Sequence, residues 1–205
     1  MEFSNLQSGI ATLVVILVVG FVCKKIGILD QKGRQVLSTL TINVALPAML
    51  MDATLNASID FSENLVLKML CAVGAFLIIT FLLASLIAKD CDNSDVYMTA
   101  NGNLGFLGFP LVAVFFGKDA LFYAVWLSIP IVILSSSFFA SRKKERLSWK
   151  MLFNPPIIAS VVAIALFLGK PPIPPFITDT LNYVGSLAIP GAILVVGASL
   201  GNTKI

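Results

Sequence analysis

The sequence consists mainly of long, nearly uncharged apolar stretches separated by short polar segments. A helix needs about 20 predominantly apolar residues to cross the hydrocarbon core of a bilayer. Seven stretches are of roughly this kind, and several of the polar breaks between them carry the Pro, Gly, Asn or Asp typical of turns. We therefore predict an all-α polytopic membrane protein, with no soluble domain between helices at residues 6–28, 36–53, 65–88, 96–116, 120–140, 152–168 and 181–200.

The composition supports a lipid-exposed protein and excludes several chemistries. Hydrophobic residues make up 58% of the chain and charged residues 12%, against about 25% charged in a soluble domain. The chain has no histidine, and its three cysteines form no C-x-x-C pair. This argues against His-based metal sites, catalytic triads and zinc knuckles. We predict no enzyme, no metal and no cofactor, and the net charge of +3 gives no reason to expect nucleic acid as a partner.

The basic residues indicate how the helices are oriented. Glu2 precedes the first apolar stretch and Lys24 and Lys25 follow it, so we expect an uncleaved first helix with its N-terminus outside. With this orientation, of the 14 Lys and Arg residues only Lys68, Lys118 and Lys170 fall on the outer side. The positive-inside rule then makes residues 141–150 a cytoplasmic basic loop of a multi-pass protein in the cell (inner or plasma) membrane.

A short internal similarity suggests an inverted repeat. Residues 45–50 (ALPAML) match residues 188–193 (AIPGAI) in character, and they lie in the second and seventh predicted helices. Helices five apart cross the membrane in opposite senses, as inverted repeats require. We predict a first five-helix repeat at residues 1–140, a basic loop at 141–151 and the start of a second repeat at 152–205. The same offset predicts roughly 285 residues for a complete protein, with three further helices.

The fourth predicted helix contains the best candidate for a binding site. Its segment 101–110 (NGNLGFLGFP) is unsuited to a continuous helix, because each glycine costs about 1 kcal/mol relative to alanine and a proline about 3. Pro110 would free the carbonyl of Phe106 at mid-membrane depth, which is tolerable around a cavity or inside protein. The alternative is a glycine-lined helix contact with a proline kink. The candidate substrate-binding residues are Asn101, Asn103, Gly105, Phe106, Gly108, Pro110 and, in the second helix, Asn43.

Three further prolines are predicted to kink their helices. Pro47 would free the carbonyl of Asn43, and Pro190 and Pro130 would act in the same way on the residues four positions earlier. The asparagine is more easily explained as a local partner for the freed backbone than as a substrate ligand. Asp52 and Asp179 are expected at helix margins, so the sequence offers no mid-membrane carboxylate for a proton relay.

Four stretches together resemble the auxin efflux carrier family, which includes plant auxin exporters and bacterial carriers of malate or malonate. They are residues 43–47 (NVALP), 103–111 (NLGFLGFPL), 154–158 (NPPII), and LAIP at 187–190 with GASL at 197–200. They cover the chain in the order found in the family, and the stretch in the fourth helix is the most specific.

The resemblance implies ten helices in two inverted five-helix repeats. Helices one, two, six and seven would form a scaffold, through which a homodimer could form, and two crossing broken helices would hold the substrate. Asn103 and Pro110 match the asparagine and proline of the first broken helix. The sequence departs from the family by ending at Ile205, before the second broken helix, whose proline we expect near position 253 by the repeat offset.

The function predicted from these features is secondary transport of a small organic anion, such as a mono- or dicarboxylate. The carrier would export or exchange its substrate by alternating access, with the anion bound where the broken helices cross. Two alternatives remain open: a non-transporting remnant or fragment of such a carrier, and a sodium-coupled symporter of the bile-acid type. The sequence does not fix the substrate, the direction of transport or the coupling ion.

Overall fold

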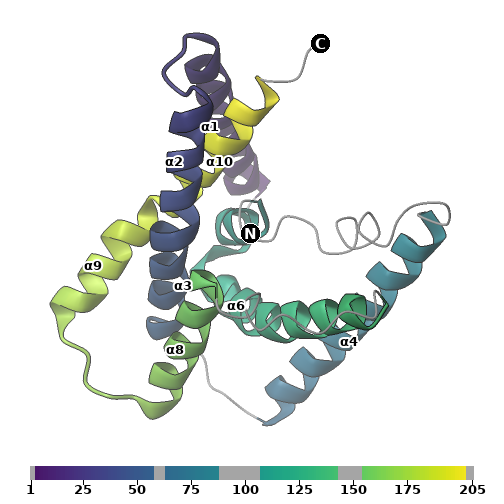
Figure 1. Ribbon diagram of the computed structural model, residues 1–205. Helices are drawn as coiled ribbons and strands as arrows, with labels where there is room; N and C mark the ends of the chain where they lie inside the picture. Colours follow the sequence, from purple (N-terminus) through teal and green to yellow (C-terminus); the bar gives the residue numbers. More distant parts are fainter. Residues whose placement is uncertain (1–2, 58–62, 88–106, 143–153, 202–205) are drawn as a thin grey trace.

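The computed structural model describes residues 3–57, 63–87, 107–142 and 154–201, and every regular element in these ranges is helical. Figure 1 shows their arrangement. The elements are α1 (Phe3–Lys25), α2 (Gln31–Leu40), the π-helical segment η1 (Thr41–Ala45), α3 (Leu46–Leu55), α4 (Glu63–Ile87), α6 (Phe109–Arg142), α8 (Pro155–Gly169), α9 (Pro175–Ser186) and α10 (Ala188–Leu200).

Within the described ranges, three apolar helical segments are long enough to cross a membrane: Gln7–Lys25, Gln31–Leu55 and Pro175–Leu200. Shorter apolar helices lie at Leu67–Thr80, Asp119–Ile133 and Pro155–Gly169. The prediction of an all-α polytopic membrane protein is confirmed. In Figure 1, α1, α2 and α10 pack together at one end, α3 continues from α2 toward α8 and α9, and α6 lies against α4.

Local signals place the helix ends, and some differ from the predicted boundaries. The second helix begins at Gln31 because the Asp30 side chain caps it, accepting the Gly33 backbone N–H at 2.6 Å. The seventh begins at Pro175 rather than near residue 181, because proline is preorganised for the first helical turn. Helices four and five are separated as predicted, by Gly117, whose φ of 85° and ψ of 179° suit only glycine.

The prolines of the spanning segments affect the backbone in three different ways. One turn before Pro47 the helix widens into η1, where the Leu46 N–H reaches back five residues to the Thr41 carbonyl. Before Pro190 the helix is interrupted at Leu187, which separates α9 from α10. Around Pro130 the backbone stays helical. Proline's missing N–H is thus accommodated by a π turn, by a break, or within a regular helix.

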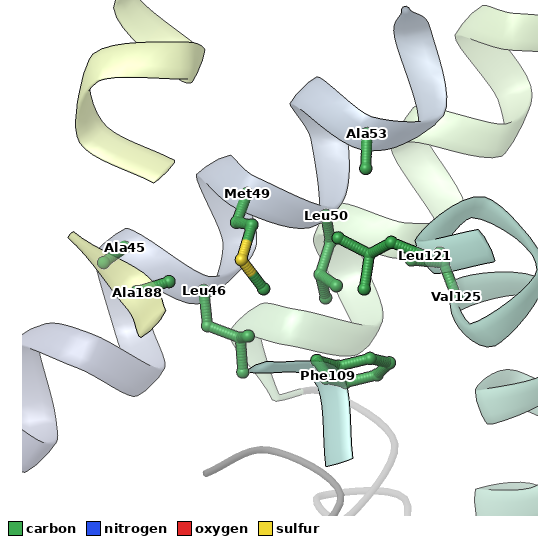
Figure 2. Packing of buried hydrophobic residues seen from close by; sticks show 9 residues of the cluster. All are labelled: Ala45, Leu46, Met49, Leu50, Ala53, Phe109, Leu121, Val125 and Ala188. Atoms are coloured by element: carbon green, nitrogen blue, oxygen red, sulfur yellow. The ribbon is translucent and has the colours of Figure 1, made fainter. Parts of the chain in front are cut away.

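The best packed part of the molecule surrounds α3. Its apolar side chains meet Phe109, Leu121 and Val125 from α6, and Figure 2 shows them converging. On the other side, Ala45 of η1 lies beside Ala188, the first residue of α10. Small residues make this approach possible, since a Cβ on Gly185 would lie 2.8 Å from Met49 Cα and one on Gly191 2.6 Å from Thr41 Oγ1. The interrupted seventh helix therefore crosses the widened second helix at close range.

A second close contact joins α1 to α10. A Cβ added to Gly197 would collide with the backbone carbonyl oxygen of Leu17, and one added to Gly20 would collide with that of Leu194. Lipid tails are as apolar as these helices, so close packing rather than hydrophobic burial must hold the pair together. Most of the remaining surface of α1 is exposed, as expected for a lipid-facing helix.

We expect Gly197→Ala to destabilise the protein by about 1–3 kcal/mol, because the added methyl group overpacks the contact between α1 and α10. The matched control is Gly74→Ala on α4, where an added Cβ meets no atom within 4 Å. Thermal unfolding in detergent should show a lower midpoint for Gly197→Ala and an unchanged or slightly higher one for Gly74→Ala. Equal midpoints for the two variants would contradict the close α1–α10 packing.

Candidate functional site

The predicted binding segment is only partly within the described chain. Asn101, Asn103, Gly105 and Phe106 lie outside the described residues, whereas Gly108 and Pro110 lie within them. Leu107 and Gly108 form a π-helical turn directly before α6, and Pro110 is the second residue of α6 and fully buried. The described part of the segment is thus a distorted helical turn, of a kind often found at functional sites.

Gly108 lines a cavity of about 350 Å³ between α4 and α6. The described walls are almost entirely apolar, and Ser128 is the one hydroxyl-bearing residue among the described lining residues; its hydroxyl donates to the Val125 carbonyl at 2.7 Å. These walls suit the hydrocarbon part of a ligand, while a carboxylate would need donors from elsewhere. The lining residues are Ala72, Val73, Phe76, Gly108, Phe109, Val112, Ala124, Leu127, Ser128 and Ile131.

A second apolar cavity of about 260 Å³ lies along the same pair of helices, beside Pro130. It shares Val73 and Leu127 with the first cavity and also reaches Ile164 of α8. Both hollows are half-open, and α4 meets α6 over a smaller part of its length than α3 meets α8 and α9.

Asn43 is on a different helical segment from Gly108 and Pro110. It lies on η1, its side chain is exposed, and it is not among the residues that line either cavity. Of the candidate residues that the structure describes, Gly108 lines the cavity, Pro110 lies two residues further along the chain, and Asn43 is on η1. The Asn43 carbonyl precedes Pro47 by four residues, where the helix has already widened. The role of Asn43, as a local partner for the freed backbone or as a substrate ligand, stays a prediction.

A polar cluster that sequence reasoning missed joins α3 to α9. Asp52 lies one turn from the end of α3, as its expected marginal position requires, but it is only 4% exposed. Its Oδ1 accepts from Asn56 Nδ2 at 2.8 Å, and its Oδ2 accepts from Asn182 Nδ2 at 3.1 Å. Both carboxylate oxygens thus receive an amide donor, as burial of such a group demands. We name Asp52, Asn56 and Asn182 the polar bridge.

The sequence indicates only the local pair of the polar bridge and not its third residue. Asp52 and Asn56 are four residues apart and so share a helix face, which could have been recognised as a pair. Asn182 is 130 residues away, and only the crossing of α9 over α3 brings it to the carboxylate.

Replacing Asp52 with alanine should destabilise the protein by about 1–3 kcal/mol, because the hydrogen bonds from Asn56 and Asn182 to its buried carboxylate are lost. Asp52→Asn keeps the shape of the side chain and one acceptor oxygen, so this variant should lose less stability than Asp52→Ala. Exposed Asp179, on the same helix as Asn182, gives the control variant Asp179→Ala. Thermal unfolding of the three variants tests the bridge, and equal effects of Asp52→Ala and Asp179→Ala would rule it out.

Comparison with known proteins identifies the class to which this arrangement of helices belongs. The chain belongs to the membrane transport protein family, whose model matches residues 8–147 and 142–205. This is the auxin efflux carrier family that the four sequence stretches resemble. The two matched segments meet within the basic stretch 141–150.

Two archaeal proteins are similar over nearly the whole chain. An uncharacterized transporter of Methanocaldococcus jannaschii is 27% identical over 207 residues, covering 92% of this chain and 67% of the relative. An uncharacterized transporter of Methanothermobacter thermautotrophicus is 23% identical over 212 residues, covering 98% of this chain and 70% of the relative. The family and these relatives make the protein a membrane transporter.

Proposed function

We propose that this transporter exports or exchanges small organic anions, such as mono- or dicarboxylates, and that they bind beside the distorted turn before Pro110. The observation that carries this proposal is the cavity lined by Gly108, which adjoins the segment with Asn101 and Asn103. A family of membrane transporters provides the context, and the substrate class is our inference.

The proposed site has a polar part and an apolar part. The side-chain amides of Asn101 and Asn103 each offer two N–H donors, and a carboxylate can accept all of them without a cationic partner. An anion at this depth is costly, so neutral dipoles must replace its water. The cavity beside Gly108 would receive the hydrocarbon part of the substrate. Such a division favours short carboxylates with a small apolar body.

Alternating access would require one group of helices to move against another. The close packing around α3, α9 and α10 suits a rigid scaffold, whereas the looser contact between α4 and α6 suits the part that binds and moves. We propose this division into scaffold and transport parts, with five-helix repeats starting near residues 1 and 152. Dimerisation through the scaffold helices stays a prediction of the resemblance, for which native mass measurement is the test.

The transport site is tested by Asn103→Ala in proteoliposomes loaded with a radiolabelled mono- or dicarboxylate. Loss of a hydrogen bond to a charged group costs about 1.5–3 kcal/mol, so transport efficiency should fall about tenfold or more. Gln35→Ala, which removes an exposed amide on α2, is the control and should transport normally. Normal transport by a correctly inserted Asn103→Ala variant would refute the site, and sodium-dependent uptake would favour the symporter alternative.

We also propose that the N-terminus faces outward and that residues 141–150 face the cytoplasm. The test uses single cysteines at Ser4 and Ser148 in a protein whose three native cysteines are replaced by serine. A membrane-impermeant maleimide added to intact cells should label the cysteine at position 4 and spare the one at position 148 until the cells are opened. The reverse pattern would invert the topology.

A further inference from the structure

Four cationic side chains gather where α1 ends and α2 begins. Lys24 and Lys25 are the last two residues of α1, and Lys32 and Arg34 lie in the first turn of α2. The connecting turn is short because Gly27 adopts a φ of 84° and the Leu29 N–H bonds back to the Cys23 carbonyl at 3.0 Å. We name Lys24, Lys25, Lys32 and Arg34 the basic rim, which lies at the upper end of α1 and α2 in Figure 1.

The basic rim keeps a net positive charge. Asp30 is the one acidic residue between Lys24 and Arg34, which leaves four positive charges against one negative. The Asp30 carboxylate is also engaged locally, as the N-cap that accepts the Gly33 backbone N–H. Because Asp30 caps α2, its carboxylate does not neutralise the lysines, which stay available to an external anion.

The helix dipoles explain only half of this charge. Cations are favourable at a helix C-terminus, so Lys24 and Lys25 suit the end of α1. Lys32 and Arg34 occupy the N-terminal turn of α2, where the dipole favours anions and disfavours cations. Local helix electrostatics thus work against the second pair, and an external negative charge at this position would offset the penalty.

Contacts hold three of the four cations in place, two of them with the end of α10 and one within α1. Arg34 is half-buried, and its Nη1 donates to Ser199 Oγ of α10 at 3.1 Å. Lys25 Nζ lies 5.4 Å from the centre of the Phe21 ring. The stem of Lys24 covers Gly201, where an added Cβ would lie 2.8 Å from Lys24 Cγ. The positive charges are therefore partly preorganised.

Apolar side chains in the same turn indicate a ligand with a lipid tail. Ile26 is 64% exposed and Ile28 68% exposed, and both lie between the two pairs of cations. Because this turn ends a membrane-spanning helix, it lies at the level of the lipid headgroups. The lysines suit the phosphate headgroup of an acidic phospholipid, and the exposed isoleucines suit its acyl chains. Free inorganic phosphate has no apolar part that could contact the isoleucines.

We propose that the basic rim binds the phosphate headgroup of an acidic phospholipid, with Ile26 and Ile28 against its acyl chains. Arg34 would present its remaining N–H groups to a phosphate oxygen, since a guanidinium suits such contacts. Lys25 and Lys32 would flank the headgroup from the two helices. Because Ser199 holds Arg34, a lipid bound here would stabilise the junction of α1, α2 and α10. This site is separate from the cavity beside Gly108 and does not depend on the proposed substrate.

The experiment compares thermal unfolding of the detergent-solubilised protein titrated with phosphatidylglycerol, phosphatidylcholine or inorganic phosphate. Phosphatidylglycerol should raise the unfolding temperature and phosphatidylcholine should not. Lys25→Gln combined with Lys32→Gln should weaken the apparent affinity for phosphatidylglycerol about 25-fold, at about fivefold for each cation near an anionic lipid. Lys68→Gln combined with Lys170→Gln removes the same charge elsewhere and should leave the affinity unchanged.

Two outcomes would overturn the proposal. Equal loss of affinity in both double variants would mean that phosphatidylglycerol responds to net charge alone. Stabilisation by millimolar inorganic phosphate equal to that by phosphatidylglycerol, and unaffected by Ile26→Ser with Ile28→Ser, would assign the site to a free anion. Unfolding in phosphatidylcholine checks that each variant is folded, since all the replaced side chains are exposed.

Discussion

In the hydrocarbon core of a bilayer, every backbone N–H and C=O must find its partner within the protein, and this requirement governs where the helices bend and meet. Pro47 and Pro190 each remove a donor from a spanning segment. The chain responds with a π turn in one case and a break at Leu187 in the other. The two irregular stretches then pack against each other, with Ala45 beside Ala188, and this crossing anchors the packed region around α3.

The closeness of packing differs between two parts of the molecule. Around α3, glycines on α9 and α10 bring backbones into near contact and the polar bridge satisfies a buried carboxylate. Between α4 and α6, two apolar cavities remain beside Gly108 and Pro130. The proposed alternating access would use this difference, with the closely packed part as the scaffold.

Helix content, membrane class and family could be predicted from the sequence, because apolar runs and proline-containing stretches report them directly. The break at Gly117 and the irregularity before Pro190 were also predictable, since glycine and proline act on their own backbone. The start of α9 at Pro175 differs from the predicted start near residue 181, because a proline that interrupts a helix can also occupy its first turn. Of the predicted site, Gly108 and Pro110 can be placed, whereas the asparagines at 101 and 103 lie outside the described residues.

Long-range contacts were the least predictable feature. Asp52 looked like an ordinary polar residue at a helix margin, and its burial depends on the approach of Asn182 from a helix 130 residues later. In the same way, no local sequence pattern predicts the hydrogen bond from the Arg34 guanidinium to Ser199. Such pairs depend on how the helices cross, and the hydrophobic pattern of a single helix does not predict the crossing.

The two glycine contacts between α1 and α10 also limit how the molecule can move. Gly197 fits against the Leu17 carbonyl and Gly20 against the Leu194 carbonyl, so each helix supplies one small residue and one backbone group to the other. The residues one turn from Gly20 on α1 are all larger, so sliding α1 by a turn, about 5.4 Å, would bring a side chain to a position that has room only for hydrogen. The first and last described helices are therefore fixed in axial register, and any conformational change must carry them together as one body.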